Sequence, residues 1–380
     1  MQPDQQAHHT AFDYQTMTGR PSSWRDNRAA RIDGFNIINS SNGGGIVVNG
    51  YGDYLNISNN RVATNSGSFG GGIRVGHPQL VDVDGTGDYA DSSNDFMSIH
   101  HNQVMFNGGL GGAGAGISMN TGSDDYQITQ NWVCGNFSAR DGGGIGHYGL
   151  SDNALIANNT VIFNESFFQG QTVHGGGVFI SGAPPVLGNA TPGSGNVQVL
   201  SNLIQGNSAG AGDGGGIRLS LINGEDVAAQ PGDSNAWYGV DIMNNMIVNN
   251  VTGMAGGGIS LQDAVKVNLV HNTIANNDSL ATAADAFTPG NPNQSTPQPG
   301  AGLVTRNHTE DLLEIVGASI GTFSIPATFS DNIIWQNRQF YFFVDTITTD
   351  NGLCPDLNGT LACPTGNTVV FDDVGVIGSP

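Results

Sequence analysis

A pair of asparagines spaced five residues apart recurs eight times, and this repeat constrains the fold more than any other feature of the chain. Each first asparagine has an apolar residue three positions before it and another two positions after it. The pairs are Asn60/Asn65, Asn102/Asn107, Asn131/Asn136, Asn159/Asn164, Asn202/Asn207, Asn245/Asn250, Asn272/Asn277 and Asn332/Asn337. A motif that returns with fixed internal spacing is typical of stacked copies of one structural unit. The sequence therefore predicts a repeat architecture.

A glycine cluster that leads into an apolar residue completes most units. Examples are GGGI ending at Ile73 and Ile217, GGGV ending at Val178 and the weaker GAGL ending at Leu303. The shortest units are 27 to 29 residues long, which suits three short strands that bend round a core and pair with the next coil. We expect an all-β parallel β-helix of about eight coils, with glycine turns and with asparagine ladders whose members adopt the left-handed conformation.

The two motifs together resemble the repeats of a known group of bacterial surface proteins. VATN ending at Asn65 and IVNN ending at Asn250, each followed by GGGI, are similar to the F-x-x-N and GGA[ILV] repeats of polymorphic outer-membrane proteins and related anchored surface proteins. The resemblance covers residues 32–340 and implies a right-handed parallel β-helix, or β-solenoid. This scaffold carries adhesins, lyases, hydrolases, epimerases and phage tailspikes, so the resemblance implies no single activity.

Departures from the repeat divide the chain into three parts. Residues 1–31 lack the repeat and are expected to cap the open end. Residues 32–345 form the β-helix, whose first coil carries Phe35 where asparagine is expected, and residues 346–380 form a cysteine-containing loop and a tail. The N-terminus has no apolar core of a signal peptide, and both ends are those expected of a domain from a longer protein.

Four insertions interrupt the β-helix and mark its candidate binding surface. Three of them follow the glycine-led strand, and the fourth precedes its glycine turn. They are residues 77–96, 181–196 and 221–239, and residues 278–300. Because the first three occupy one coil position, they should protrude from the same side of the rod and form a binding face. The fourth should project from a different edge.

The first insertion contains an acidic stretch that is a candidate calcium loop. Alternating oxygen-bearing side chains with a glycine at the turn resemble an EF-hand loop, although Ser93 stands where the bidentate glutamate is expected. The candidate ligands are Asp82, Asp84, Thr86, Asp88, Asp91 and Asp95. A solvated acidic loop without a bound ion is the alternative interpretation of the same residues.

The candidates for catalysis in the sequence are two aspartates and one histidine. Asp124 and Asp125, followed by Gly146 and His147, faintly resemble the paired carboxylates and Gly-His of polygalacturonase-like hydrolases. His147 lies two residues after Ile145, which predicts that its side chain points inward while the acids lie at a turn. A lyase would need a basic group beside a cation, but Arg74 and Arg218 fall in different coils.

Three cysteines are relevant to whether the protein lies in an oxidising compartment. Cys354 and Cys363 lie nine residues apart in a turn-rich segment, which predicts a small disulfide loop and an oxidising environment. Two free thiols are the alternative. Cys134 lies in the strand-like segment WVCGN and is predicted to be a packed core thiol.

The charge balance limits the partners. Asp and Glu number 32 against 11 Lys and Arg, a formal net charge of -21, which disfavours nucleic acid and insertion into a membrane. The sequence thus favours a non-catalytic extracellular or cell-surface scaffold that binds a polysaccharide or another surface protein. The alternative is a carbohydrate-active enzyme, a polysaccharide lyase, glycoside hydrolase or epimerase. An enzyme should concentrate carboxylates, arginines and aromatics in one cleft, whereas a scaffold should scatter them.

Overall fold

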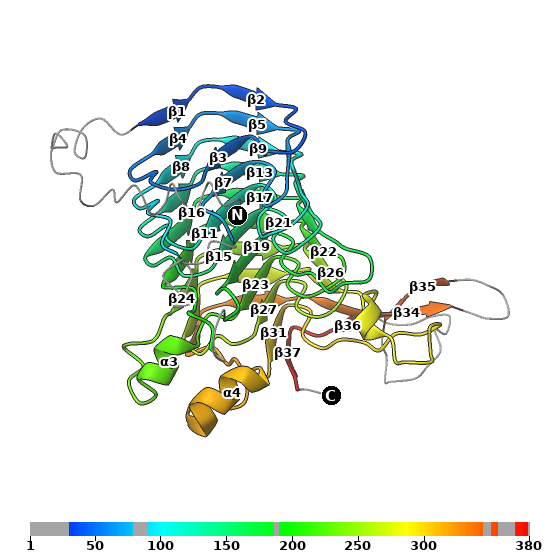
Figure 1. Cartoon of the computed structure of the whole chain (residues 1–380). Helices are drawn as coiled ribbons and strands as arrows, with labels where there is room; N and C mark the ends of the chain where they lie inside the picture. The colour runs from blue at the N-terminus through cyan, green and yellow to red at the C-terminus, as the bar shows by residue number, and fades with distance from the viewer. Residues whose placement is uncertain (1–29, 79–89, 186–189, 345–350, 356–368, 379–380) are drawn as a thin grey trace.

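The chain forms a parallel β-helix, as the repeat predicts. The structure is a computed structural model that describes residues 30–78, 90–185, 190–344, 351–355 and 369–378. Four sheets, here named A to D, run along the rod (Figure 1). Each coil after the first contributes strands to all four sheets in turn, and the first coil contributes none to sheet C. Neighbouring strands within a sheet come from successive coils and pair in parallel, apart from the last strands of sheet C.

Sheets A and B carry the strands on either side of the first asparagine of each pair. Sheet A comprises β1 (Arg31–Asp33), β4 (Asn56–Ser58), β8 (Ser98–His100), β12 (Gln127–Thr129), β16 (Ala154–Ala157), β20 (Val197–Leu200), β24 (Val240–Met243), β28 (Val267–Val270) and β32 (Thr328–Ser330). Sheet B comprises β2 (Asn36–Ile38), β5 (Arg61–Ala63), β9 (Gln103–Met105), β13 (Trp132–Cys134), β17 (Thr160–Ile162), β21 (Leu203–Gln205), β25 (Met246–Val248), β29 (Thr273–Ala275) and β33 (Ile333–Trp335).

Sheets C and D follow the second asparagine and the glycine cluster. Sheet C comprises β6 (Ser66–Gly67), β10 (Gly108–Gly109), β14 (Phe137–Ser138), β18 (Glu165–Ser166), β22 (Ser208–Ala209), β26 (Val251–Thr252), β30 (Asp278–Ser279), β34 (Arg338–Val344), β35 (Asn351–Pro355) and β36 (Val370–Phe371). Sheet D comprises β3 (Ile46–Val48), β7 (Ile73–Val75), β11 (Ile117–Asn120), β15 (Ile145–Tyr148), β19 (Val178–Ser181), β23 (Ile217–Ser220), β27 (Ile259–Leu261), β31 (Leu303–Arg306) and β37 (Val374–Ile377).

The apolar columns of the sequence line the interior. In sheet A, Ile99 pairs with Ile57 and Ile128, and all three are fully buried. In sheet D, Ile145 pairs in the same way with Ile117 and Val178. Each such side chain contributes about 1.5–3 kcal/mol of hydrophobic free energy. The repeat of the sequence is therefore the repeat of the core.

The asparagine ladders form as predicted. The Asn131 amide donates to Asn159 Oδ1 at 3.1 Å, and the Asn159 amide donates to Asn202 Oδ1 at 3.0 Å. The second asparagines form a parallel ladder in the same way, for example from Asn136 to Asn164 at 2.8 Å. These side chains are buried, so the ladders satisfy polar groups inside the rod.

The prediction that the ladder asparagines adopt the left-handed conformation is wrong. The positive φ angle belongs to the residue before each one, such as Asn158 at 57° before Asn159 and Phe163 at 55° before Asn164. The left-handed residue turns the chain, so that the following asparagine can point its amide inward to the next coil. Phe163 keeps its side chain exposed.

The glycines of each cluster stand where backbones approach closely. A Cβ on Gly144 would lie 2.5 Å from the carbonyl oxygen of Gly177, and Gly142 has a φ of 69°. A side chain therefore cannot be accommodated at the last glycine without moving the neighbouring coil. This close packing brings the residue before each cluster near its counterpart in the next coil.

The two ends extend the helix beyond its regular repeats. Ile32 and Ile37 pair with Ile57 and Val62, which confirms the predicted incoming coil. Residues 374–377, assigned to the tail from the sequence, form β37, which pairs in parallel with β31. Within the described residues, no helix is long and apolar enough to cross a bilayer.

The cysteines differ in their placement. Cys134 is a partly exposed free thiol, not the core residue that the sequence predicts, because Val133 takes the inward position of β13. Cys354 lies in β35 and is buried. Cys363 lies outside the described residues, so the Cys354–Cys363 disulfide stays a prediction.

Candidate functional site

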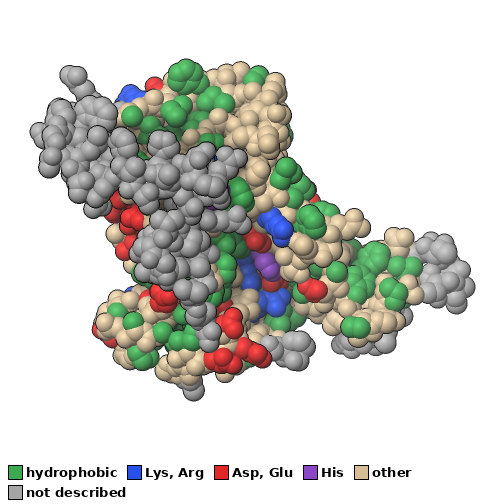
Figure 2. All heavy atoms as spheres, in the orientation of Figure 1, with side chains coloured by type: hydrophobic (Ala, Val, Ile, Leu, Met, Phe, Trp, Pro, Cys, Tyr) green, Lys and Arg blue, Asp and Glu red, His purple; other side chains and the backbone are tan. Residues whose placement is uncertain are grey.

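Loops on both sides of sheet D leave a hollow over its outer face. On one side lie the connections from sheet D to sheet A, which contain the helices α3 (Glu225–Ala229) and α4 (Glu310–Val316) with its following turn η3 (Gly317–Ile320). On the other side lie the connections from sheet C to sheet D, including residues 167–177 and a segment with the turn η2 (Ala284–Ala286). Figure 2 shows basic, acidic and histidine side chains gathered in the hollow between these walls.

The residue before each glycine cluster forms a column along the edge of sheet D. Asp141, His174 and Asp213 hold this position in three successive coils. The Gly142 amide donates to the His174 carbonyl at 2.9 Å, and the Gly175 amide donates to the Asp213 carbonyl at 3.0 Å. Strand spacing sets successive members about 4.8 Å apart. Two acids and one imidazole thus lie within about 10 Å along one line.

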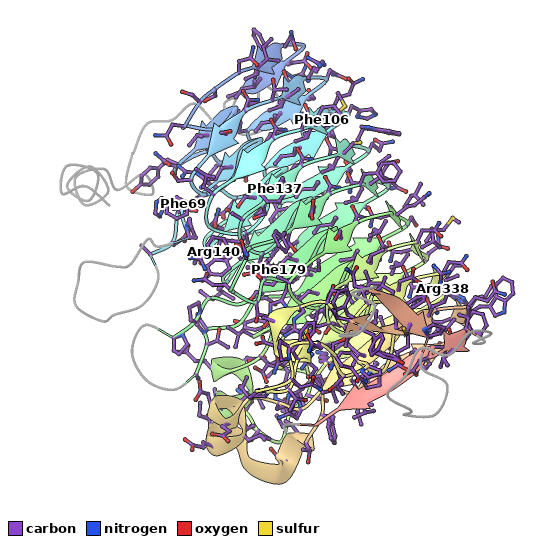
Figure 3. All side chains as sticks on the ribbon, turned by 90° about the vertical axis from the view of Figure 1, so that its right-hand side faces the viewer. Phe69, Phe106, Phe137, Arg140, Phe179 and Arg338 are labelled. Atoms are coloured by element: carbon purple, nitrogen blue, oxygen red, sulfur yellow. The ribbon has the colours of Figure 1, made fainter. Side chains whose placement is uncertain are left out.

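Two arginines from the outer face of sheet D reach this column. Arg306, at the end of β31, makes a two-point contact with Asp213, through Nε to Oδ2 at 2.7 Å and Nη2 to Oδ1 at 2.8 Å. Arg218, in β23, places Nη1 at 3.3 Å from Asp213 Oδ2 and donates to Ser260 Oγ at 2.7 Å and to Gln262. Figure 3 places Arg140 and Phe179 along this same side of the rod.

Asp213 is ionised and held by the arginines. Burial would raise the pKa of its carboxyl, but the charges of Arg306 and Arg218 outweigh burial and hold the pKa below its ordinary value. Burial lowers the pKa of Arg218 to about 10, so this guanidinium stays charged at neutral pH. Arg218 and Asp213 are only 2% and 3% exposed. The cluster is therefore a desolvated pair of cations sharing one anion.

His174 is neutral, with its proton on Nε2. The backbone amide of Asp213 donates to His174 Nδ1 at 3.0 Å, so this nitrogen is an acceptor. Nδ1 lies 3.8 Å from Asp213 Oδ2, but because Nδ1 carries no proton the two groups do not form an ion pair. Burial, reinforced by the charge of Arg218, lowers the pKa of His174 to about 3. The side chain is 23% exposed, so part of the ring reaches the molecular surface.

Among the groups of the cluster with a shifted pKa, the Asp141 carboxyl has the pKa closest to neutral pH. Burial raises the pKa of its carboxyl to about 6, against a hydrogen bond from the His174 amide to Oδ1 at 2.7 Å. The Asp141 backbone amide is a second, weaker hydrogen-bond donor to the same carboxyl group. A carboxyl group held by two backbone amides, with a pKa near 6, is suited to proton transfer.

The acids and histidine singled out from the sequence do not meet in this hollow. His147 is fully buried and points inward, as the strand alternation predicts, with Tyr126 Oη at 2.8 Å from Nδ1 and the Ser194 carbonyl oxygen at 2.8 Å from Nε2. Asp125 lies at a turn with a φ of 55°. Asp124 Oδ1 accepts the Asp152 amide at 2.7 Å. These contacts give His147 and Asp124 structural roles.

The candidate calcium loop lies mostly outside the described residues. Asp82, Asp84, Thr86 and Asp88 belong to this undescribed part. Asp91 is exposed and accepts the Ser93 amide at 2.7 Å, while Asp95 Oδ1 accepts the Asp124 amide at 3.0 Å. Over the portion of the chain that the structure covers, no three His, Cys, Asp or Glu side chains are arranged to hold a metal. Calcium binding thus stays a sequence prediction.

The separation of Arg74 and Arg218 agrees with the sequence analysis. Arg74 lies in β7 and Arg218 in β23, and three strands of sheet D lie between them. The arginine that does join Arg218 is Arg306, which follows the weaker GAGL cluster. The signal in the sequence for this cluster is the residue before the glycines, whose fixed offset puts Asp141, His174 and Asp213 in register. It was not among the predicted site residues.

An aspartate ladder at the entry to sheet A is a second feature that sequence analysis missed. Asp95 Oδ1 accepts the Asp124 amide, and the Asp95 amide donates to Asp53 Oδ1 at 3.1 Å. Asp152 Oδ1 continues the ladder to the Asn196 amide at 2.8 Å. Each aspartate lies four residues before an inward isoleucine, for example Asp95 before Ile99. Stacked carboxylates repel one another, unlike stacked amides.

Replacing Asp95 by asparagine should therefore stabilise the protein at neutral pH. Burial first, then the neighbouring acids, raise the pKa of Asp95 to about 6. Its contribution to stability is present below the ordinary value of 3.8 and is lost as pH rises through 6. We expect Asp95→Asn to gain about 1 kcal/mol at pH 8, discounted for solvent screening, and to gain nothing near pH 4. Urea unfolding at both pH values measures this.

Asp331→Asn is the control for the loss of one negative charge. Asp331 is exposed and has a φ of 56°, a conformation that asparagine accepts. An equal gain in both variants, or a gain from Asp95→Asn that does not change with pH, would contradict the assignment to ladder repulsion.

Comparison with known proteins gives no relative to which the site can be referred. No protein-family profile, curated protein or solved structure matches the chain. The function must therefore be argued from the geometry of the hollow and its charged cluster.

Proposed function

We propose that the protein is a polysaccharide-cleaving enzyme that acts on a uronate-containing chain laid in the hollow over sheet D. The supporting observation is the concentration of Asp141, His174, Asp213, Arg218 and Arg306 in one place. Each buried charge costs desolvation free energy, and clusters with shifted pKa values gather at functional sites. An enzyme is expected to concentrate its charged side chains in one cleft, whereas a scaffold is expected to scatter them. This arrangement therefore favours the enzyme over the scaffold.

In this proposal Asp141 transfers the proton. Its carboxyl group is ionised above about pH 6 and takes the proton from the carbon next to the uronate carboxylate. The electron pair left on that carbon forms a C=C bond as the glycosidic C–O bond breaks. The leaving oxygen takes up a proton from water, and Asp141 gives the proton that it removed back to the solvent. The products are an unsaturated sugar end and a new reducing end.

Negative charge that develops on the uronate would be stabilised by the neighbouring groups. Arg306 is partly exposed, and the Nε2 proton of His174 is a hydrogen-bond donor. Arg218 is buried, and we assign it to positioning Asp213 and Arg306. Two guanidinium groups share Asp213, so the directly paired cluster has an excess of positive charge in an otherwise acidic protein.

The occupied oxygens of Asp213 favour elimination over hydrolysis. Oδ1 accepts from Arg306 and from the Ala255 amide at 3.0 Å, and Oδ2 contacts both Arg306 and Arg218. Hydrolysis with inversion needs a second carboxylate that is available to activate water. Asp213 has no lone pair left for that task, whereas the Asp141 carboxyl is held by backbone amides and keeps lone pairs that can accept a proton.

The experiment that tests the function is cleavage of uronate polymers by wild-type protein and by Asp141→Asn. We expect ultraviolet-absorbing unsaturated ends from the wild type, a rate that falls below about pH 6, and a loss of about a thousandfold in Asp141→Asn. Asp125→Asn is the matched control and should keep full activity. Reducing ends without the absorbance would indicate hydrolysis. No product from polygalacturonate, alginate, hyaluronan or rhamnogalacturonan would favour the non-catalytic scaffold.

A further inference from the structure

A second cavity lies beside the charged cluster and belongs to the same loops. It has a volume of about 260 Å³ and lies between residues 167–172 and residues 282–285, with Gly210 and Ala211 also lining it. Residues 167–172 lead into His174, and Ala211 precedes Asp213 by two positions. The cavity is thus formed in part by the same two chain segments that carry His174 and Asp213.

Its lining combines aromatic rings with hydrogen-bonding groups. Phe167 and Phe168 are 41% and 39% exposed. Gly210 leaves space for the Phe167 ring, because a Cβ there would lie 2.9 Å from Phe167 Cδ2. Gln171 and Asp285 also line the cavity, and Asp285 accepts a hydrogen bond from Thr172. An aromatic face with amide and carboxylate groups around it suits a ring that is apolar on its face and hydroxylated at its edge.

The charges distinguish this cavity from the Asp141 cluster. Asp285 is its carboxylate, and Arg140 lies at its rim, where it contacts the Phe168 ring at 5.7 Å and donates to Gln171. A uronate carboxylate inside the cavity would be repelled by the Asp285 carboxylate. A neutral sugar, in contrast, could donate hydrogen bonds from its hydroxyl groups to Asp285. Arg140 directly precedes Asp141, which connects the rim to the proposed proton-transfer group.

We propose that this cavity binds a neutral sugar unit of the polysaccharide while the Asp141 cluster holds a uronate unit. The inference rests on the proposed function, since it assumes that one glycan occupies both places. It assigns the substrate to heteropolysaccharides in which uronate and neutral sugars alternate, rather than to homopolymers of uronate.

The test measures binding in the Asp141→Asn background, so that cleavage does not consume the probe. The probes are oligosaccharides of rhamnogalacturonan, which alternates uronate and neutral sugar, and of polygalacturonate, each assayed by calorimetry. We expect tighter binding of the alternating oligosaccharide, and about a tenfold loss for that probe alone in Phe168→Ala. Phe168→Tyr should restore it.

Phe106→Ala is the matched control. Phe106 is a 59% exposed ring on another part of the rod, as Figure 3 shows. Equal losses in Phe168→Ala and Phe106→Ala, no loss in Phe168→Ala, or preference for polygalacturonate would each overturn the cavity assignment. A normal Phe168 effect together with no cleavage of any uronate polymer by the wild type would instead support the cavity and overturn the proposed function.

Discussion

The Asn159→Val variant is expected to lose about 4 kcal/mol of unfolding free energy, because it interrupts a buried ladder in the middle of the rod. The Asn159 amide donates to the Ile128 carbonyl at 2.8 Å and to Asn202 Oδ1, and its Oδ1 accepts from the Asn131 backbone at 2.9 Å. Valine makes none of these bonds and leaves buried groups unpaired. Urea unfolding followed by circular dichroism measures the loss.

The neighbouring residue supplies the control for this substitution. Asn158 is exposed, has a φ of 57° and stands next to the ladder without belonging to it. Asn158→Gly should change stability by less than about 0.5 kcal/mol, since glycine accepts the left-handed conformation. If Asn159→Val is as stable as Asn158→Gly, the ladder does not stabilise the fold as we argue.

The Asp213→Ala variant is expected to lose about 4 kcal/mol, because it leaves two guanidinium groups without their shared carboxylate. Arg218 is only 2% exposed and cannot recover its hydration, and the Ala255 amide loses its acceptor. Because the pKa of Asp213 is held below its ordinary value, its stabilisation is present above about pH 4 and is lost at lower pH. The difference between wild type and variant should therefore shrink on acidification.

Asp278→Ala is the matched control for that variant. Asp278 also makes a two-point contact with an arginine, Arg338, but Arg338 is 43% exposed. An exposed pair contributes about 1 kcal/mol or less, so this variant should remain close to wild type. Similar losses in the two variants would indicate that burial does not set the strength of the Asp213 cluster.

The regular part of the fold could be predicted because each coil requires the same residue types at the same positions. Ile99, Ile128 and Ile156 occupy one interior column, and Asn102, Asn131 and Asn159 occupy one ladder. A residue with the wrong size or polarity in either column would leave a cavity or an unpaired buried group. Fixed spacing in the sequence thus determined the strands, their register and the core.

Part of the candidate site was also present in the sequence as a regular offset. Asp141, His174 and Asp213 each stand immediately before a glycine cluster, yet their neighbours in the column include Ala113 and Ala255. A column that mixes apolar and ionisable residues does not stand out as a repeat. Its meaning became apparent only when the coils were stacked and the three side chains lay on one edge.

By itself the sequence determined the parallel β-helix, because the length of a coil and the positions of its inward-facing residues recur at fixed spacing along the chain. Only the tertiary structure decided which charges meet. Arg306 lies 93 residues from Asp213 and ends β31, two strands beyond β23 in sheet D. Their contact depends on the stacking of coils that are separated in the sequence by loops of irregular length. Burial and pKa values follow from that contact, because desolvation and the distance between charges are properties of the packed molecule and not of residue order.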